Sequence, residues 1–238
     1  MSLLEKLVEP TPPGGQAAPP KSKKQPHPAI EHIREGKWVL DVIPYTASAD
    51  KNASYFLPWF WQRLKEEGLI ELYFPGAAET SFGEFCVLFT NPSVKKLLFL
   101  LKDPSTLDNE MPTVVDCVGF ATWAPMEWGG VQVGNCGFIF LRDYWDRETT
   151  IRGCRRAMQY WFHEMEPSLD ICLGLNPKGN VLVQRFMPRI GWTRVGQLPI
   201  PQYYGGEYSD MVVWYITKGQ FDGQGGQGQV AQAVQESK

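Results

Sequence analysis

Residues 134 to 165 constrain the fold more than any other part of the chain, because an apolar run there gives way to a charged turn and then to a helical pattern. The run from Gly134 to Leu141 is rich in aromatic and β-branched residues, which predicts a strand. The following residues predict a helix from about Asp146 to Met165, whose apolar stripe comprises Ile151, Cys154, Met158, Trp161, Phe162 and Met165. Unpaired backbone N–H groups and the helix dipole attract anions where a strand leads into a helix N-terminus. The junction is therefore a candidate cofactor site.

The turn at this junction also has a purely structural interpretation. It carries Asp146 and Glu148, and it contains no glycine. Asp146 is a suitable N-cap, Thr149 follows three residues later, and Glu148 stands four residues before Arg152 on the helix surface. These residues predict a helix start that satisfies its own backbone, as the alternative to phosphate binding.

Composition narrows the class of protein. The chain has 238 residues, 43% of them hydrophobic, which is enough to bury a core, and a net charge of -3. This charge gives no overall drive toward nucleic acid or an anionic membrane, and no apolar run is long enough to span a bilayer. The five cysteines form no Cys-x-x-Cys pair and the three histidines have no ligand spacing, so we expect reduced thiols in a cytoplasmic compartment and no metal site.

The two ends differ in composition from the middle. Residues 1–30 are rich in proline, and residues 219–238 are rich in glycine and glutamine. Such segments bury too little apolar surface to offset the entropy lost on ordering. We expect both to be flexible extensions that bind protein partners.

Residues 31–218 are expected to form one domain of mixed α/β class. Its turn signals, including Asp-Pro at 103–104 and Gly-Gly at 129–130, favour antiparallel neighbours. Pro58 is expected in the first turn of its helix, and Gly68 at the end of that helix. Strands are predicted at 38–43, 70–74, 84–90, 94–101, 114–123, 134–141, 170–175, 192–198 and 211–217, and helices at 48–68, 146–165 and 178–190.

The order of these elements and three short motifs carry a family resemblance. Asn180 lies eleven residues before Gly191-Trp192, and the last strand ends Tyr-x-x-Lys within the segment from Asp210 to Lys218. In this order and spacing the chain resembles the GNAT superfamily of acyl-CoA N-acyltransferases, well over residues 114–218 and loosely over 38–101. The resemblance implies a mixed, largely antiparallel sheet flanked by helices, an acetyl-CoA cofactor and N-acetyl transfer to an amine.

The resemblance also assigns roles to residues. It implies that the strand 134–141 splays from the strand 170–175 and that the pantetheine arm of acetyl-CoA pairs with the backbone between them. The cofactor-binding residues would be Phe138, Ile139, Phe140 and Leu141 for the arm, Arg142, Arg147 and Arg152 for the phosphates, and Asn180 near the thiol. Glu127, or a water molecule, is the candidate base that deprotonates the acceptor amine.

Two positions depart from the family pattern. The turn 146–150 lacks the glycines through which backbone N–H groups reach the pyrophosphate. Met187 stands where many members have the tyrosine that acts as general acid and protonates the leaving thiolate. Two hypotheses follow. The protein is an acetyl-CoA-dependent N-acetyltransferase, active or degenerate, acting on a small-molecule or protein amine in the cytoplasm. Alternatively, it is a non-catalytic GNAT-like structural or assembly protein, for example in a viral particle, that binds partners through its terminal extensions.

Overall fold

The computed structural model describes residues 33–35, 38–45, 53–70, 81–91, 93–106, 114–204 and 206–224. The predicted N-terminal extension, residues 1–30, lies outside these ranges, and so do residues 225–238 of the predicted tail. The strand predicted at 70–74 lies outside them as well, except for Ile70, which is helical.

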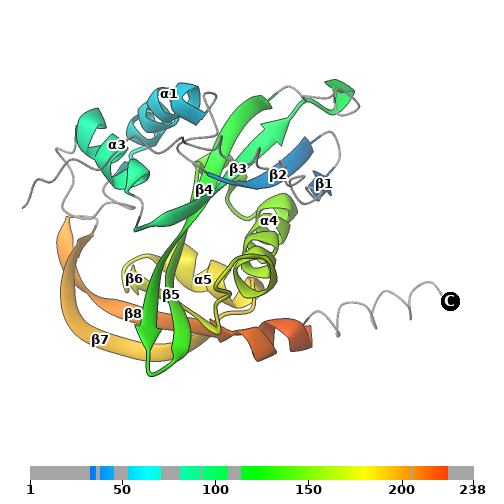
Figure 1. Cartoon of the computed structure of the whole chain (residues 1–238). Helices are drawn as coiled ribbons and strands as arrows, with labels where there is room; N and C mark the ends of the chain where they lie inside the picture. Colours follow the sequence, from blue (N-terminus) through cyan, green and yellow to red (C-terminus); the bar gives the residue numbers. More distant parts are fainter. Residues whose placement is uncertain are drawn as a thin grey trace, which may run out of the picture.

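Eight strands form one sheet in the order β1-β2-β3-β4-β5-β6-β8-β7 (Figure 1). Every neighbouring pair is antiparallel except β5 and β6, which run parallel. The strands are β1 Ile33–Glu35, β2 Trp38–Pro44, β3 Lys95–Lys102, β4 Val114–Trp128, β5 Val131–Phe140, β6 Ile171–Pro177, β7 Thr193–Tyr204 and β8 Glu207–Thr217. The predicted fold class, a mixed and largely antiparallel sheet flanked by helices, is confirmed.

Helices cover both faces of the sheet (Figure 1). They are α1 Ala53–Glu66, α3 Phe82–Thr90, α4 Glu148–Gln159 and α5 Val181–Arg189, with a π-helical turn at Tyr160–Glu164 after α4 and short 3-10 turns at Pro104–Thr106 and Arg142–Tyr144. α1 and α3 bury Phe60, Leu64, Phe85 and Phe89 against one face. α4 and α5 form the core on the other face, into which α4 places most of its predicted apolar stripe. Because α4 connects the parallel strands β5 and β6, it serves as the crossover helix that such a pair requires.

The strand predicted at 84–90 is wrong, because this segment is the helix α3. Ser81 and Glu84 form a capping box: the Glu84 backbone N–H donates to Ser81 Oγ at 3.2 Å, and the Ser81 N–H donates to Glu84 Oε2 at 2.6 Å. This reciprocal pair satisfies two of the donors that a helix start leaves open. Phe85 and Phe89, four residues apart, then share the buried face of the helix.

The start of α1 also differs from expectation. Pro58 was expected in the first turn, yet α1 begins at Ala53 and Pro58 lies inside the helix. The chain leaves the helix at Gly68, which has a φ of 63° and accounts for the predicted stop. No helix in the described part of the chain is long and apolar enough to cross a membrane.

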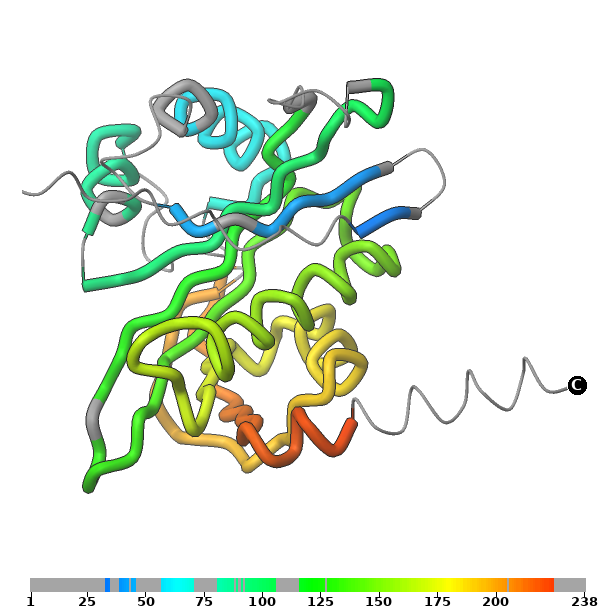
Figure 2. Tube along the Cα trace, turned by 45° about the vertical axis from the view of Figure 1, so that its right-hand side comes forward, coloured from blue at the N-terminus to red at the C-terminus, as the bar shows by residue number. Residues whose placement is uncertain are grey.

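The packed part of the chain extends past the predicted boundary at residue 218. Residues 218–224 are helical, and they lie beside α5 and the C-terminal end of α4 in the orange-red part of Figure 2. The Phe221 ring packs on Phe162 with centroids 5.5 Å apart. Gln224 Nε2 donates to the carbonyl of Gly191 at 3.0 Å. This helix therefore ties the end of the sheet to α4 and α5.

Candidate functional site

The parallel strands β5 and β6 are hydrogen-bonded neighbours over only three residue pairs. These pairs are Val133 with Ile171, Gly134 with Cys172, and Asn135 with Leu173. Beyond them β5 stays paired with β4 as far as Phe140, and β6 stays paired with β8 as far as Pro177. The two strands therefore diverge after Asn135 and Leu173, between the parts of the sheet that carry α4 and α5.

Aromatic side chains occupy the helix-covered side of this divergence. The Phe138 ring lies 5.4 Å from the Trp161 ring and 6.3 Å from the Trp192 ring. Trp192 reaches across to β6, since a Cβ at Gly174 would stand only 3.0 Å from its ring. Met187, at the position where many GNAT members have a tyrosine, is buried beside Gly174 as well. The cleft is thus filled by side chains on the face toward α4 and α5.

The backbone at the end of β5 also has partners within the protein. Trp145 Nε1 donates to the carbonyl of Phe140 at 2.9 Å, and the N–H of Leu141 donates to the carbonyl of Val118 at 3.0 Å. Three of the four residues assigned to the pantetheine arm, Ile139, Phe140 and Leu141, have buried side chains, and Phe138 is half-buried.

The turn between β5 and α4 has an unusual backbone. Asp146 has a φ of 62°, the only positive value for a non-glycine residue in the described ranges. L-residues adopt this left-handed conformation at a cost, and aspartate tolerates it better than most. The Asp146 carboxylate forms an ion pair with Arg189, the last residue of α5. The pair joins the strand-to-helix turn to a second helix.

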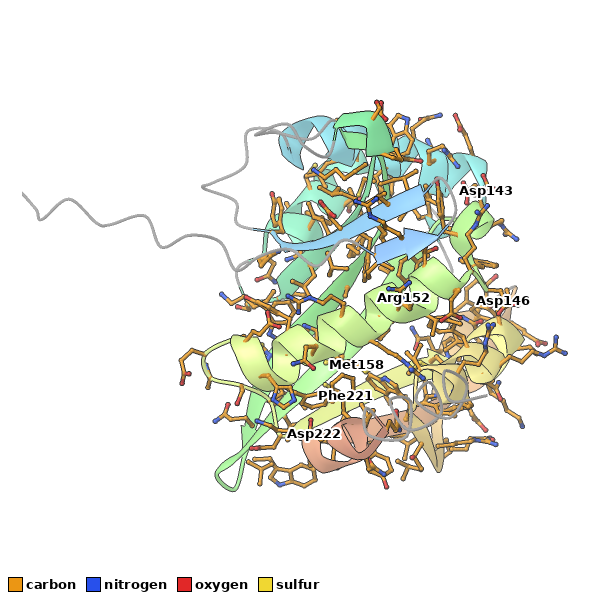
Figure 3. The ribbon with its side chains drawn as sticks, turned by 90° about the vertical axis from the view of Figure 1, so that its right-hand side faces the viewer. Asp143, Asp146, Arg152, Met158, Phe221 and Asp222 are labelled. Carbon is orange, nitrogen blue, oxygen red and sulfur yellow. The ribbon has the colours of Figure 1, made fainter. Side chains whose placement is uncertain are left out.

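The predicted capping of α4 by Asp146 is wrong. The N-cap residue of α4 is Arg147, which makes no side-chain cap hydrogen bond. The Asp146 carboxylate pairs with Arg189 and does not cap the helix. In the first turn of α4, Thr150 Oγ1 donates to the carbonyl of Tyr144 at 2.5 Å. Figure 3 shows Asp143 and Asp146 at this end of α4, with Arg152 farther along the helix.

Each of the three predicted phosphate ligands has a partner within the protein. Arg142 donates its backbone N–H to Glu67 Oε2 at 2.7 Å, and its guanidinium lies over the Trp145 ring at 5.2 Å. Arg147 Nε donates to the carbonyl of Asp143 at 2.5 Å. Arg152 Nη1 donates to the carbonyl of Arg34 on β1 at 3.1 Å. The structure does not gather these three guanidinium groups at one point. Two further basic residues reach the turn from other helices, Arg63 at Asp143 and Arg189 at Asp146, and sequence analysis selected neither.

The remaining predicted site residues lie on separate elements. Asn180 is the N-cap of α5: its Oδ1 accepts the N–H of Val183 at 3.2 Å, and the residue is only 4% exposed. Of its two proposed roles, the structure contains the helix cap. Glu127 lies in β4 opposite Gln132 of β5. Gln132 is three residues before Asn135, where β5 diverges from β6.

A half-buried carboxyl group near the turn was missed by sequence analysis. Asp116, in β4, has one oxygen 3.3 Å from the Tyr144 hydroxyl, which donates to it. Its other oxygen is buried without a hydrogen-bond partner in the described part of the chain. Burial raises the pKa of Asp116 to about 6, while the positive charge of Arg63 and the bond from Tyr144 oppose the shift. No sequence signal marks this residue, because a lone aspartate in a strand resembles any surface carboxylate.

Metal and thiol chemistry have little support among the described residues. No three His, Cys, Asp or Glu side chains gather there as metal ligands. All five cysteines are free thiols, as expected. Burial raises the pKa of the Cys117 thiol to about 12 and that of Cys154 well above its ordinary value, so neither is poised to react as a thiolate.

Solved GNAT acetyltransferases match this chain over most of its length. A spermidine N-acetyltransferase from Vibrio cholerae, solved with CoA and spermine, matches with a TM-score of 0.56 and 13% identity, covering 76% of this chain and 97% of its own. A GNAT-family acetyltransferase from Bacillus anthracis matches with a TM-score of 0.52 and 17% identity, covering 79% of this chain and 97% of its own. A ribosomal-protein α-N-acetyltransferase solved with CoA matches with a TM-score of 0.54 and 12% identity, covering 75% of this chain and 93% of its own. No family model and no curated protein matches in sequence. The chain has the GNAT acyltransferase fold.

Proposed function

We propose that this protein is a non-catalytic GNAT-fold protein that acts by binding protein partners. The observation that carries the proposal is the ion pair between Asp146 and Arg189 in the turn before α4. In the GNAT fold this turn corresponds to the glycine-rich segment that receives the cofactor pyrophosphate. Here a carboxylate stands at that segment, and it pairs with the guanidinium of Arg189, while the Arg147 guanidinium is bound to the carbonyl of Asp143 and Arg63 pairs with the Asp143 carboxylate at 3.6 Å.

The electrostatics of the turn disfavour a bound pyrophosphate. Asp143, Asp146 and Glu148 are all exposed carboxylates within six residues. At about 4 Å, one like-charge contact costs roughly 1 kcal/mol in water and about 4 kcal/mol at an effective dielectric of about 20. The helix N-terminus returns only about 0.3 to 2 kcal/mol. Asp146 is paired with Arg189 and Asp143 with Arg63 at 3.6 Å, which reduces the repulsion from these two carboxylates. A single full like-charge contact is nevertheless enough to offset the attraction that the helix start provides.

The arm of the cofactor would meet a second obstacle. The carbonyl of Phe140 already accepts a hydrogen bond from Trp145, and the rings of Phe138 and Trp192 meet across the diverging strands. A pantetheine arm in this cleft must displace an indole N–H and separate packed rings, at a cost in hydrogen bonding and in buried apolar area.

Binding is supported by the surface of the domain. Trp128, next to the β4–β5 turn, is 73% exposed, and Tyr208, next to the β7–β8 turn, is 74% exposed. Large exposed aromatic side chains are typical anchors of protein interfaces. Together with the proline-rich residues 1–30 and the tail 219–238, they favour an assembly role, of the kind found in viral particles.

The second candidate function is an acetyl-CoA-dependent N-acetyltransferase. The divergence of β5 and β6 after three residue pairs favours it, because GNAT enzymes hold the thioester arm between these strands. Two of the neighbouring structures contain CoA. In this alternative the backbone of residues 138–141 holds the arm, Asn180 lies near the thiol, and Glu127 or a water molecule deprotonates a small-molecule or protein amine.

Calorimetry with acetyl-CoA separates the two candidates. We expect no saturable heat from the full-length protein up to millimolar ligand, with a known CoA-binding acetyltransferase as the positive control. Saturable binding in the micromolar range would refute the non-catalytic proposal and favour the enzyme.

The binding role has its own test. Deleting residues 1–30 should leave the melting temperature of the domain nearly unchanged. The truncated protein should no longer capture the protein partner that the full-length protein captures. A truncated chain that still assembles normally would remove the support that the extension gives.

A further inference from the structure

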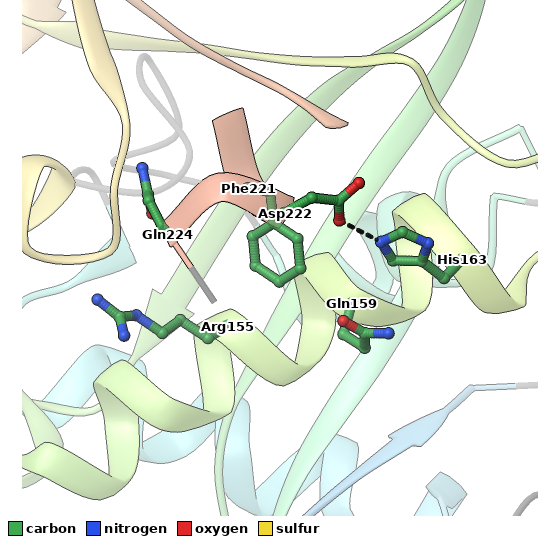
Figure 4. Close-up of a pocket in the computed structure, with 6 residues that line it drawn as sticks. All are labelled: Arg155, Gln159, His163, Phe221, Asp222 and Gln224. Atoms are coloured by element: carbon green, nitrogen blue, oxygen red, sulfur yellow. Dashed lines mark hydrogen bonds and ion pairs between the residues drawn. The ribbon is translucent and has the colours of Figure 1, made fainter. Parts of the chain in front are cut away.

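A cavity of about 380 Å³ lies between α4 and the helical residues 218–224 (Figure 4). It is close to the C-terminal end of α4, whereas Asp146 and the turn lie at the opposite end (Figure 3). Its volume falls in the range of small-molecule sites. The lining residues are Arg155, Gln159, His163, Phe221, Asp222 and Gln224.

The walls of the cavity are held in place by contacts among the lining residues and with residues behind them. Phe221 packs on Phe162, and its ring also lies 6.3 Å from the His163 ring. His163 Nε2 and Asp222 Oδ1 are 2.8 Å apart, and Gln224 is bound to the carbonyl of Gly191. The second half of the helix 218–224 is thus fixed on the π-helical turn after α4 and on Gly191 after α5, and the cavity is formed before any ligand arrives.

The cavity has opposite charges at its two ends. Figure 4 shows Arg155 on one side of the Phe221 ring, and Asp222 with His163 on the other. Arg155 Nη2 donates to the carbonyl of Arg189 at 3.2 Å, which uses one of the five N–H donors of a guanidinium. Asp222 uses Oδ1 for His163 and has a second oxygen for another donor. The ring of Phe221 supplies an apolar floor between them.

We propose that this cavity binds a short zwitterionic peptide with free ends. Its carboxylate pairs with Arg155, its ammonium group pairs with Asp222, and its body lies on the Phe221 ring. Arg155 and His163, the partner of Asp222, are eight residues apart along α4 and the π-helical turn after it, so their backbones are separated by at most about 12 Å. An extended tripeptide spans roughly 10 Å, which matches this separation once the two side chains lean inward. The proposal is independent of whether the β5–β6 cleft binds CoA.

Trialanine is the probe for this site, titrated into the full-length protein and followed by calorimetry and by NMR. We expect millimolar binding, with shifts in the side-chain amide signals of Gln159 and Gln224. N-acetyl-trialanine and trialanine amide each lack one terminal charge. Each should bind at least about tenfold more weakly, because a charge-assisted hydrogen bond is lost.

Two variants assign the ends of the peptide. Arg155→Gln should remove the preference for the free carboxylate, so that trialanine and its amide bind equally. Asp222→Asn should remove the preference for the free ammonium group in the same way. Arg152→Gln is the matched control, because that guanidinium lies on the same helix and contacts the carbonyl of Arg34 instead.

The proposal fails if trialanine does not bind, or if the capped peptides bind as well as the free one. It also fails if Arg155→Gln, with an unchanged melting temperature, leaves the carboxylate preference intact. That measurement decides the matter even if Asp222→Asn unfolds the helix 218–224.

Discussion

Replacing Asp146 with glycine tests the proposal that its carboxylate prevents the turn before α4 from binding the cofactor pyrophosphate. Glycine adopts a φ of 62° without steric cost, so the turn should keep its backbone while losing the carboxylate. The substitution also releases Arg189 from its ion pair. One change therefore removes a negative charge and frees a positive one at the same point.

The effect on stability should be small, because the contributions oppose each other. Relief of the left-handed conformation stabilises the variant by about 1 kcal/mol. Loss of the ion pair costs about 0.2 to 1 kcal/mol, since the side chains of Asp146 and Arg189 are 79% and 42% exposed. The extra freedom of glycine in the unfolded chain costs roughly 0.5 to 1 kcal/mol. We expect the free energy of unfolding, measured in urea, to change by less than about 1 kcal/mol.

The effect on CoA binding should be larger. Removing a carboxylate about 4 Å from a phosphate gains roughly 1 kcal/mol even at the dielectric constant of water. A freed guanidinium adds a charge-assisted hydrogen bond of about 1.5 to 3 kcal/mol. Together these contributions predict CoA binding at least about tenfold tighter than wild type by calorimetry.

Two controls separate the causes. Asp146→Asn removes the charge but keeps a side chain that tolerates the same φ, so it should give most of the gain. Glu166→Gln changes the net charge equally at an exposed position beyond the end of the helix, and it should give none. An Asp146→Gly protein that folds normally and binds CoA no better than wild type would show that the turn is not what limits cofactor binding.

Three further predictions concern the domain itself. The native pKa of Asp116 is raised from 3.8 to about 6, so between these pH values the folded protein holds a proton that the unfolded chain releases; the contribution of Asp116 to stability should be largest below about pH 4 and fall by about 1 to 2 kcal/mol toward pH 6.5, and Asp116→Asn should remove this part of the pH dependence in urea titrations. Ser81→Ala should cost about 1 kcal/mol of unfolding free energy by removing the cap of α3. Phe221→Ala should cost about 1 to 3 kcal/mol and expose the amides of residues 218–224 to hydrogen exchange, while the β4–β5 hairpin stays protected.

Much of the fold was predictable because it is governed by local periodicity. The apolar stripe that includes Ile151, Cys154 and Met158 identified α4, and these side chains are all buried. Short apolar runs separated by turn residues identified the central strands. A motif with fixed spacing, Asn180 to Gly191-Trp192, then placed α5 and the corner after it.

The helix α3 was missed because two local signals compete in its sequence. The segment from Phe82 to Thr90 contains five aromatic or β-branched residues, which suit a strand. Its buried positions, Phe85 and Phe89, nevertheless have helical spacing, and the Ser81–Glu84 box fixes the start of the helix. The capping box was present in the sequence and outweighs the propensity of the residues after it.

The candidate site was less predictable, because its interactions join residues that are far apart in the chain. Arg189 reaches Asp146 across 43 positions, and Tyr144 reaches Asp116 across 28. No periodicity encodes such pairs. The arginines near the turn were reasonable phosphate ligands by position, but backbone carbonyls hold two of their guanidinium groups instead: that of Asp143 binds Arg147, and that of Glu67, 75 positions away, binds Arg142.

In the proposed non-catalytic function, the turn before α4 is the place where the fold persists without the chemistry associated with it. In this chain the passage from β5 into α4 includes one residue in the left-handed conformation, Asp146. Glycine adopts this conformation and leaves the backbone N–H groups accessible to an anion. Asp146 adopts it too, since aspartate tolerates the conformation, but it brings a carboxylate that needs a cation, and Arg189 supplies one. The geometric demand of the fold and the electrostatic demand of the cofactor are therefore separable at a single residue, and under the proposed function this chain satisfies only the first.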